Sequence, residues 1–288
     1  MQVVRTVTQW RSIRRSLSSQ TQRIGLVPTM GFLHDGHLSL IRIARQHCDI
    51  IVVTCFVNPT QFVPGEDFER YPRDENRDLA LLKQEGVDYV LLPGGDDIYP
   101  EGFSTSIQPP ASSQGWCGQS RPGHFQGVCT IVSILFNLVQ PHFAFFGRKD
   151  AQQCAVIQAM TRDLNFPIEI VLCPIVRESD GLAMSSRNVY LSDEERRRAL
   201  VLSKTLRLGL TLFQQGVVDS QAVLDEGKKQ IQTMEGVRLD YLGVVNQNTF
   251  KSVSIIQPGN YYIGAMYVGT TRLIDNMVFG LGEAPCSE

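Results

Sequence analysis

The chain of 288 residues has no apolar run long enough to cross a bilayer as a helix. Its longest runs, residues 50–57 and 131–139, fall far short of the roughly 20 residues that such a helix needs. An excess of one charge is also missing, because 27 Lys and Arg residues nearly balance 29 Asp and Glu residues, for a net charge of -2. This balance argues against a main role in binding DNA or an anionic membrane, so any basic site must be local.

The sequence has 7 cysteines but no C-x-x-C pair. The number is odd, the residues are scattered, and most of them lie in apolar runs, where cysteine serves as a small hydrophobic side chain. Neither Cys48 nor Cys55 has metal-ligand spacing to the nearest histidines. We therefore expect reduced thiols and a location in the cytoplasm.

Acidic residues are absent from residues 1–34, a segment that contains several arginines. A transit peptide can have this composition. Apolar residues recur in the same segment at helical spacing, from Val3 to Leu17, and this favours a short strand and an amphipathic helix that lead into the fold. Both interpretations stay open, and we favour the second.

The overall composition, 43% hydrophobic and 19% charged, is typical of a soluble globular protein. Apolar runs alternate with helical patterns in the first half, which predicts a Rossmann-like α/β domain built on a parallel sheet. We expect its strands at residues 24–27, 50–57, 89–92, 143–146 and 168–172, and its helices at residues 37–46, 74–85, 127–138 and 151–163.

The later part of the chain has a different pattern. Two expected helices, residues 192–215 and 219–234, precede two expected strands, residues 239–245 and 261–268. Helices followed by strands are typical of a smaller α+β domain. We therefore expect a catalytic domain at residues 1–178 and a second domain at residues 179–288.

A parallel sheet binds its ligand where the loops leave the carboxyl ends of the strands. The first such loop reads PTMGFLHDGH over residues 28–37. His34 and His37 lie three residues apart at the start of a predicted helix, so their rings can face the same way. A helix N-terminus with two imidazole donors suits a triphosphate under attack at its α-phosphorus. A structural cap or a metal site is the competing interpretation.

Amides follow the second expected strand. Asn58 and Gln61 can each donate and accept hydrogen bonds, which suits a polar substrate with hydroxyl and carboxylate groups. Taken alone, the Asn-Pro pair at residues 58–59 indicates only a turn. Its position relative to the histidine loop favours binding.

Charged and hydroxyl side chains follow the fourth and fifth expected strands. Lys149 offers a point cation for a phosphate, Asp150 can accept from a ribose hydroxyl, and Gln153 lies one helical turn further on. A solvated Lys-Asp pair explains that stretch equally well on its own. The MSSR segment at residues 184–187 places two hydroxyls before an arginine, a pattern that can surround phosphate oxygens.

Seven short motifs occur in one order. They are PTMG at residues 28–31, HDGH at 34–37, NPTQF at 58–62, YPR at 71–73, RPGHF at 121–125, KDAQQ at 149–153 and DGLAMSSRN at 180–188. Each motif is weak alone, but the series, which extends to RLIDN at residues 272–276, is highly specific. The chain resembles the pantoate-β-alanine ligase (pantothenate synthetase) family, within the nucleotidyltransferase superfamily that carries the His-x-Gly-His signature.

The resemblance implies sites for ATP, pantoate and β-alanine. The family's ATP contacts correspond to Met30, Gly31, Phe32, Leu33, His34, Asp35, Gly36, His37, Gly147, Arg148, Lys149, Asp150, Val176, Met184, Ser185, Ser186 and Arg187. Pantoate contacts are expected at Asn58, Gln61 and Gln153, and β-alanine is expected near Gln61. His37 corresponds to the family's usual catalytic residue, and a clamp on the phosphates is expected to include His34, Lys149, Ser185, Ser186 and Arg187.

Two stretches depart from the family pattern. Arg148 stands where the family often has glutamate, from which we expect unchanged chemistry and altered local electrostatics. Residues 277–288 match nothing in the family, and we expect them to be disordered.

The resemblance also implies the reaction. The carboxylate of (R)-pantoate attacks the α-phosphorus of ATP, pyrophosphate leaves, and the amine of β-alanine then displaces AMP from pantoyl adenylate to give pantothenate. Magnesium is expected, held chiefly by the triphosphate, together with a homodimer and closure of the second domain over the adenylate.

Two alternatives stay open from the sequence alone. A plain adenylyltransferase would release no AMP when an amine is added, and it would leave Asn58, Gln61 and Gln153 without an obvious purpose. A non-catalytic nucleotide sensor would bind ATP but form no pyrophosphate, and we would then expect the catalytic basic residues to be lost, whereas here they are present.

Overall fold

The computed structural model describes residues 1–17 and 21–281. The chain forms two compact units. The first comprises Met1–Pro110, Arg121–Arg148 and Val156–Cys173, and the second comprises Ala111–Ser120, Lys149–Ala155 and Pro174–Glu288. The chain therefore enters the second unit three times. The domain division after residue 178 stays a prediction.

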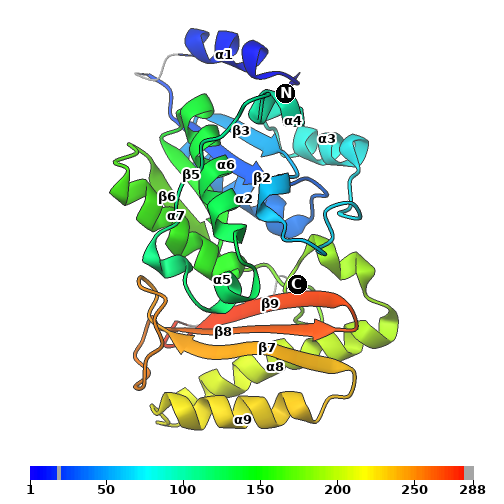
Figure 1. The fold of residues 1–288 in the computed structure, drawn as a ribbon, viewed down its shortest axis with the longest axis vertical. Coiled ribbons are helices and arrows are strands. Elements are labelled where there is room, and N and C mark those ends of the chain that lie inside the picture. The colour runs from blue at the N-terminus through cyan, green and yellow to red at the C-terminus, as the bar shows by residue number, and fades with distance from the viewer. Residues whose placement is uncertain (18–20, 282–288) are drawn as a thin grey trace. The chain divides into compact units, whose positions relative to one another are not determined.

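The first unit contains a six-stranded parallel sheet in the order β1-β4-β3-β2-β5-β6 (Figure 1). Its strands are β1 (Gln2–Val4), β2 (Ile24–Thr29), β3 (Ile50–Cys55), β4 (Tyr89–Leu91), β5 (Phe143–Gly147) and β6 (Glu169–Cys173). The five strands expected in this half are confirmed. Their apolar runs are continuous because both faces of a doubly covered sheet are buried.

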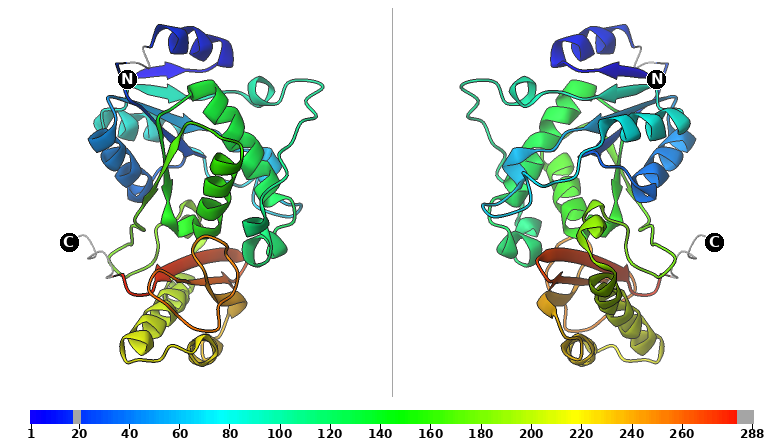
Figure 2. Two further views of the ribbon diagram at one scale, coloured as in Figure 1. Left: turned by 90° about the vertical axis from the view of Figure 1, so that its left-hand side faces the viewer. Right: turned by 90° about the vertical axis from the view of Figure 1, so that its right-hand side faces the viewer.

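Helices cover both faces of this sheet. In Figure 2, α2 (Asp35–His47) and α3 (Glu75–Gln84) lie on one face and α6 (His124–Val139) on the other. Strand order runs in opposite directions from β2, and right-handed crossovers then place the helices of the two directions on opposite faces. The point where the order reverses, between β2 and β5, is where such folds bind ligands.

The N-terminal strand and helix are confirmed. β1 pairs with β4, and α1 (Val7–Ser16) follows it. Trp10 of α1 is fully buried, and its indole Nε1 donates to the carbonyl of Leu138 at 2.8 Å. This helix therefore belongs to the packed fold.

The second unit contains an antiparallel sheet in the order β7-β8-β9, with β7 (Val237–Val245), β8 (Tyr261–Val268) and β9 (Thr271–Val278). Helices α8 (Asp193–Gln214) and α9 (Ser220–Gln232) contribute to the same apolar core. Ser192 caps α8 and exchanges hydrogen bonds with Glu195, as a capping box does. The predicted α+β composition of the later part is confirmed.

Our expectation of disorder from residue 277 onward is wrong for its first residues. Met277 lies in β9 opposite Tyr262, and Phe279 is fully buried. The apolar side chains of this stretch complete the core of the second unit, which holds the backbone in place. Residues 282–288, and Cys286 with them, lie outside the described part of the chain.

Three more helices and four 3-10 turns complete the described elements. They are the helices α4 (Gly95–Ile98), α5 (Trp116–Ser120) and α7 (Ala151–Asp163), and the 3-10 turns η1 (Pro59–Gln61), η2 (Ala111–Ser113), η3 (Arg148–Asp150) and η4 (Ser186–Tyr190). The six described cysteines are free thiols, as expected. Burial raises the pKa of Cys55 and of Cys129 to about 12, so both thiols are unreactive near neutral pH.

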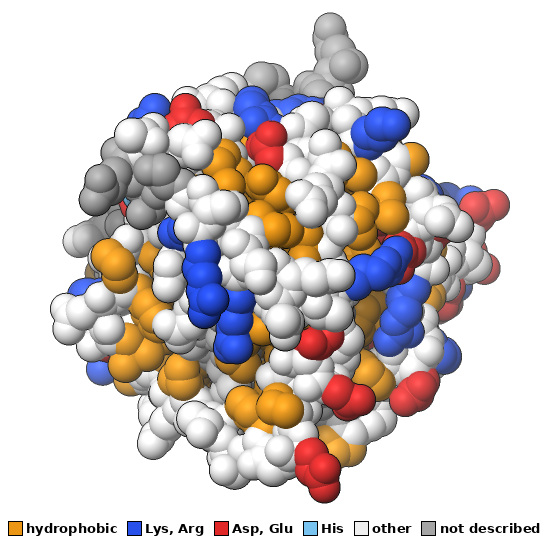
Figure 3. All heavy atoms as spheres, turned by 90° about the horizontal axis from the view of Figure 1, so that it is seen from above, with side chains coloured by type: hydrophobic (Ala, Val, Ile, Leu, Met, Phe, Trp, Pro, Cys, Tyr) orange, Lys and Arg blue, Asp and Glu red, His pale blue; other side chains and the backbone are white. Residues whose placement is uncertain are grey.

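The surface shows no concentration of one charge on the face seen in Figure 3, where Lys and Arg side chains are interspersed with Asp and Glu. This agrees with the balanced composition. Within residues 1–17 and 21–281, no helix is both long enough and apolar enough to span a membrane.

Gly127 allows α6 to approach η1. A Cβ at this position would lie 2.3 Å from the carbonyl oxygen of Thr60 and 2.7 Å from the nitrogen of Gln61, both backbone atoms. We predict that Gly127→Ala lowers the free energy of unfolding by about 1–3 kcal/mol, the usual cost of overpacking, which a thermal melt will measure as a drop of several degrees.

Gly95→Ala is the matched control for this prediction. A Cβ at Gly95, at the start of α4, meets nothing within 4 Å. An unchanged melting temperature for Gly127→Ala would contradict the close approach.

Candidate active site

The loop after β2 turns sharply into α2. Gly31 and Phe32 both have positive φ, 83° and 50°, a conformation that favours glycine and that strains phenylalanine. Asp78 of α3 fixes this turn, because its two carboxylate oxygens accept hydrogen bonds from the N–H groups of Phe32 at 2.6 Å and Leu33 at 2.7 Å. The Asp78 side chain is buried, which raises its pKa, and the two backbone hydrogen bonds act in the opposite direction.

The two histidines sit at the N-terminus of α2. His34 is the N-cap residue, and the helix begins at Asp35, two residues before the predicted start. The His34 Nδ1 accepts from the N–H of Gly36 at 3.2 Å, and the His37 Nδ1 accepts from the N–H of His34 at 3.3 Å. The ring centroids are 4.1 Å apart, so the rings lie side by side as their spacing predicts.

These contacts select one tautomer for each ring. A ring nitrogen that accepts a hydrogen bond carries no proton, so the neutral rings of His34 and His37 carry theirs on Nε2. Two Nε2–H donors therefore accompany the backbone N–H groups at this helix end.

The predicted amides lie together in the first unit. The Asn58 Nδ2 donates to the Oε1 of Gln61 at 3.1 Å and to the carbonyl of Gly127 at 3.2 Å. The Oδ1 of Asn58 accepts from the hydroxyl of Tyr99 at 2.7 Å. Asn58 is only 1% exposed, and its amide is thus occupied by protein groups.

Gln61 is the more accessible of the two amides. It is half-buried, and its Nε2 donates to the sulfur of Met30 at 3.0 Å. The structure therefore brings Asn58, Gln61 and the start of the histidine loop together. The assignment of Asn58 and Gln61 to pantoate stays a prediction, and the geometry makes Asn58 an orienting group for Gln61.

Two further ATP candidates lie at the end of β5 in the first unit: Gly147 is the last residue of the strand, and Arg148 follows it. β5 is the neighbour of β2 in the sheet, with Leu26 opposite Ala144. Arg148 lies near Cys173 of β6. Burial raises the pKa of the Cys173 thiol to about 11, and the positive charge of Arg148 acts against this rise. The departure from the family pattern at Arg148 thus places a cation beside the end of β6.

In the second unit, β9 holds the loop that carries Lys149. The Asn276 Nδ2 donates to the carbonyl of Lys149 at 2.9 Å. The preceding residue, Asp275, forms a two-point ion pair with Arg177, at 2.7 and 3.1 Å, and the two side chains are only 4% and 10% exposed. Asp150 and Gln153, which follow Lys149 in the chain, are half-buried.

The MSSR segment is braced by its own neighbours. The N–H of Met184 donates to the carbonyl of Val176 at 3.0 Å, which brings these two ATP candidates together. Ser185 caps η4, and its Oγ accepts from the N–H of Arg187 at 3.3 Å. Ser186 is buried and Arg187 is half-buried.

Ion pairs also hold the loop that precedes the MSSR segment. Arg196 of α8 forms ion pairs with Glu178 at 2.5 Å and with Asp180 at 2.9 Å. The Asn188 Nδ2 donates to Glu178 at 2.8 Å. These contacts hold both ends of the MSSR segment within the second unit.

The predicted residues fall on both units. The first unit carries residues 30–37, Asn58, Gln61, Gly147 and Arg148, and the second unit carries Lys149, Asp150, Gln153, Val176 and residues 184–187. Sequence analysis missed the groups that brace them, Asp78, Tyr99 and Asp275. Each of these three contacts a residue at least 40 positions away, and no local pattern shows such a contact.

Fold and site together define a Rossmann-like α/β protein with a His-x-Gly-His helix start after a central strand of a parallel sheet. The family model of pantoate-beta-alanine ligase matches residues 2–278. The pantothenate synthetase of Thermotoga petrophila is 48% identical over 280 residues, which cover 97% of this chain and all of that protein. The chain belongs to the pantoate-β-alanine ligase family, as its series of motifs predicts, and the predicted ligase function is confirmed.

Solved structures agree. The pantothenate synthetase of Thermus thermophilus matches with a TM-score of 0.91 and 46% identity, over 96% of this chain and 99% of that one. The pantoate-β-alanine ligase of Francisella tularensis, solved as a complex with β-γ ATP and β-alanine, matches with a TM-score of 0.80 and 33% identity, over 98% of this chain and 99% of that one. The Rossmann-like fold with a smaller α+β part is thereby confirmed.

We predict that Asp78→Asn weakens ATP binding. An amide keeps one acceptor oxygen but turns an NH₂ group toward one of the two N–H donors, and an unsatisfied buried donor costs about 1–3 kcal/mol. The KM for ATP should rise by about tenfold, measured by pyrophosphate release. The control is Glu75→Gln, which removes the same charge from an exposed position of α3. An unchanged KM for ATP in Asp78→Asn would contradict this role.

We also predict that Asn276→Ala disturbs the Lys149 loop. Loss of the 2.9 Å hydrogen bond leaves the Lys149 carbonyl without this donor. The rate of pyrophosphate formation should fall by about tenfold, consistent with about 1–3 kcal/mol. Asn248→Ala, at an exposed turn of the same unit, should leave the rate unchanged. Equal rates in the two variants would refute the prediction.

Proposed function

We propose that the chain makes pantothenate from (R)-pantoate, β-alanine and ATP through pantoyl adenylate, with the residue roles set out below. A carboxylate is a poor electrophile, so it must be activated before an amine can attack it. ATP activates it by transferring AMP to the carboxylate. The observation that carries the proposal is the pair of imidazoles at the start of α2 in a member of this ligase family.

His34 and His37 bind the phosphates in the first step. Their Nε2–H groups and the N-terminal N–H groups of α2 donate to phosphate oxygens as the pantoate carboxylate attacks the α-phosphorus. Positioning and charge stabilisation do most of the work of such a displacement, and no covalent enzyme intermediate is needed. His37 is the principal catalytic residue of the pair.

Lys149, Ser185, Ser186 and Arg187 complete the clamp on the phosphates. Lysine supplies a compact charge, and the hydroxyls and guanidinium supply directed hydrogen bonds. Residues 30–37, Gly147, Arg148, Asp150, Val176 and Met184 make up the remainder of the ATP site. Gln61 and Gln153 bind pantoate, and Gln61 also borders β-alanine.

Magnesium enters with ATP, and it neutralises charge on the triphosphate. No group of three or more His, Cys, Asp and Glu side chains in residues 1–17 and 21–281 is placed to hold a metal ion alone. The donor set of the site, imidazoles and cations, instead suits the phosphates. We therefore assign the metal ligands mainly to phosphate oxygens and water.

The proposal also covers the oligomeric state of the chain and its location in the cell. Family resemblance supports a homodimer in the cytoplasm, and sedimentation of the purified chain tests the dimer. Closure of residues 179–288 over the adenylate would exclude water from the mixed anhydride. Solution scattering with and without an ATP analogue tests this movement, and identical curves would count against it.

A two-stage assay tests the whole proposal. ATP, magnesium and pantoate should yield pyrophosphate, and β-alanine added afterwards should yield AMP. Lys149→Met should lower the first rate by about 10² to 10³, the usual effect of losing one charge-stabilising donor. Lys251→Met, at an exposed position in the same unit, should not.

Other results of this assay would support a different function or a different role for Lys149. Pyrophosphate without AMP would indicate a plain adenylyltransferase, and neither product would indicate a nucleotide sensor. Equal rates for Lys149→Met and Lys251→Met would remove Lys149 from the clamp.

A further inference from the structure

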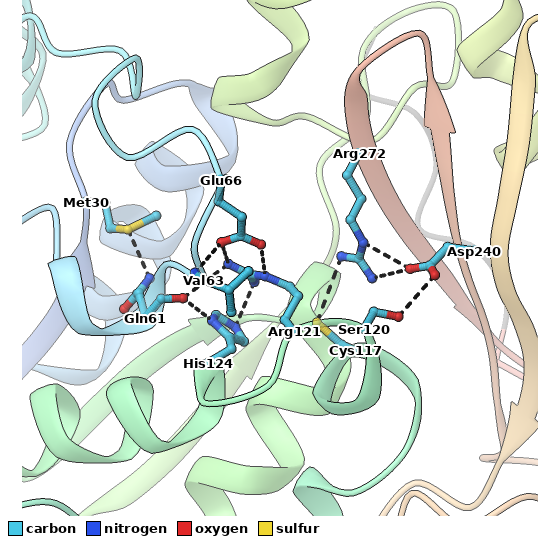
Figure 4. A network of polar contacts seen from close by, with 10 residues as sticks. All are labelled: Met30, Gln61, Val63, Glu66, Cys117, Ser120, Arg121, His124, Asp240 and Arg272. Carbon is cyan, nitrogen blue, oxygen red and sulfur yellow. Dashed lines mark hydrogen bonds and ion pairs between the residues drawn. The ribbon is translucent and has the colours of Figure 1, made fainter.

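The backbone carbonyl of Gln61 accepts two hydrogen bonds from side chains of the RPGHF motif. The His124 Nδ1 lies 2.8 Å from this oxygen, and the Arg121 Nη2 lies 3.3 Å from it (Figure 4). A carbonyl oxygen accepts and never donates, so the Nδ1 of His124 carries a proton. Two long side chains thus converge on one backbone atom of η1.

The other ring nitrogen of His124 fixes its protonation state. The Nε2 lies 2.9 Å from the Nη1 of Arg121, and a guanidinium only donates. This nitrogen must therefore accept, and it carries no proton. The ring is buried at 6% exposure. These contacts are satisfied together by one form of His124, the neutral ring protonated on Nδ1.

Glu66 holds the guanidinium in place. Its two oxygens accept from the Nε of Arg121 at 2.5 Å and from the Nη2 at 2.7 Å, and Oε2 also accepts from the N–H of Val63 at 3.2 Å. The side chains of Arg121 and Glu66 are 11% and 19% exposed. Such a two-point charged contact fixes the plane of the guanidinium.

This arrangement determines where the Gln61 side chain points. The amide of Gln61 lies between its contacts with Asn58 and Met30, so a rotation of the Gln61 backbone would move it away from both. We propose that Glu66, Arg121 and His124 are positioning residues for the hydroxy-acid substrate, acting through the Gln61 carbonyl. The inference rests on the proposed role of Gln61 in binding pantoate.

Substitutions at His124 separate its two hydrogen bonds. His124→Asn keeps a donor near the Nδ1 position, and His124→Leu keeps neither contact. With saturating ATP, the pyrophosphate assay should give a KM for pantoate about tenfold higher in His124→Leu, and within about twofold of the parent in His124→Asn. A tenfold change equals about 1.4 kcal/mol, near the upper end of the usual value for one hydrogen bond between neutral groups. The KM for ATP should stay within about twofold in both variants.

Two further variants and a melting experiment guard against a merely structural effect. Arg121→Lys keeps the charge but loses the planar guanidinium that bonds Glu66 at two points, so it should raise the KM for pantoate in the same way. Gln126→Ala, at an exposed position of α6, is the control and should change neither KM. Circular dichroism melts identify any variant that fails to fold.

A spectroscopic measurement on the unmodified chain completes the test. Nitrogen-15 spectra of labelled histidine should show one ring at neutral pH with a protonated Nδ1 and a bare Nε2, absent in His124→Leu. A His124 ring protonated on Nε2, or a KM for ATP that rises as much as that for pantoate, overturns the inference. Failure of the unmodified chain to release pyrophosphate would instead defeat the proposed function.

Discussion

The hydrogen bonds from Phe32 and Leu33 to the buried carboxylate of Asp78 are the constraint on which the site depends. They hold the chain in a turn that includes a phenylalanine at positive φ, and such a conformation persists only when its surroundings enforce it. The turn sets the direction in which α2 starts, and the start of α2 sets both imidazoles. A change at Asp78 would therefore reach the histidines through the backbone.

The same device recurs elsewhere in the molecule. Side chains hold backbone carbonyls next to the predicted binding residues, as Asn276 does at Lys149 and as Arg121 and His124 do at Gln61. A long side chain such as lysine or glutamine has many rotamers. Fixing the backbone of such a residue removes part of its conformational freedom. In each unit, the predicted binding residues are thus accompanied by polar side chains that hold their backbone.

How much of the fold and of the candidate site the sequence predicts depends on how far apart in the chain the interacting residues lie. The strands β2, β3 and β5 are continuous apolar runs, and the histidine pair is local, so both are visible in the sequence. β9 was missed because charged residues interrupt its pattern. Arg272 and Asp275 are inside the fold only because Asp240 and Arg177 pair with them, from distant parts of the chain. Asp78 is hidden for the same reason, since its partners lie 46 and 45 residues away.

The hydrogen bond at Nδ1 determines which ring nitrogen carries the proton in four of the histidines. Backbone N–H groups meet the Nδ1 of His34, His37 and His142, which places the proton of each neutral ring on Nε2. A backbone carbonyl meets the Nδ1 of His124 and places its proton there. Neutral imidazoles at the start of α2 can donate to phosphate without adding charge to the positive end of a helix. Positive charge can then come from Lys149 and Arg187. In the proposed function, donor geometry and positive charge would therefore come from different residues.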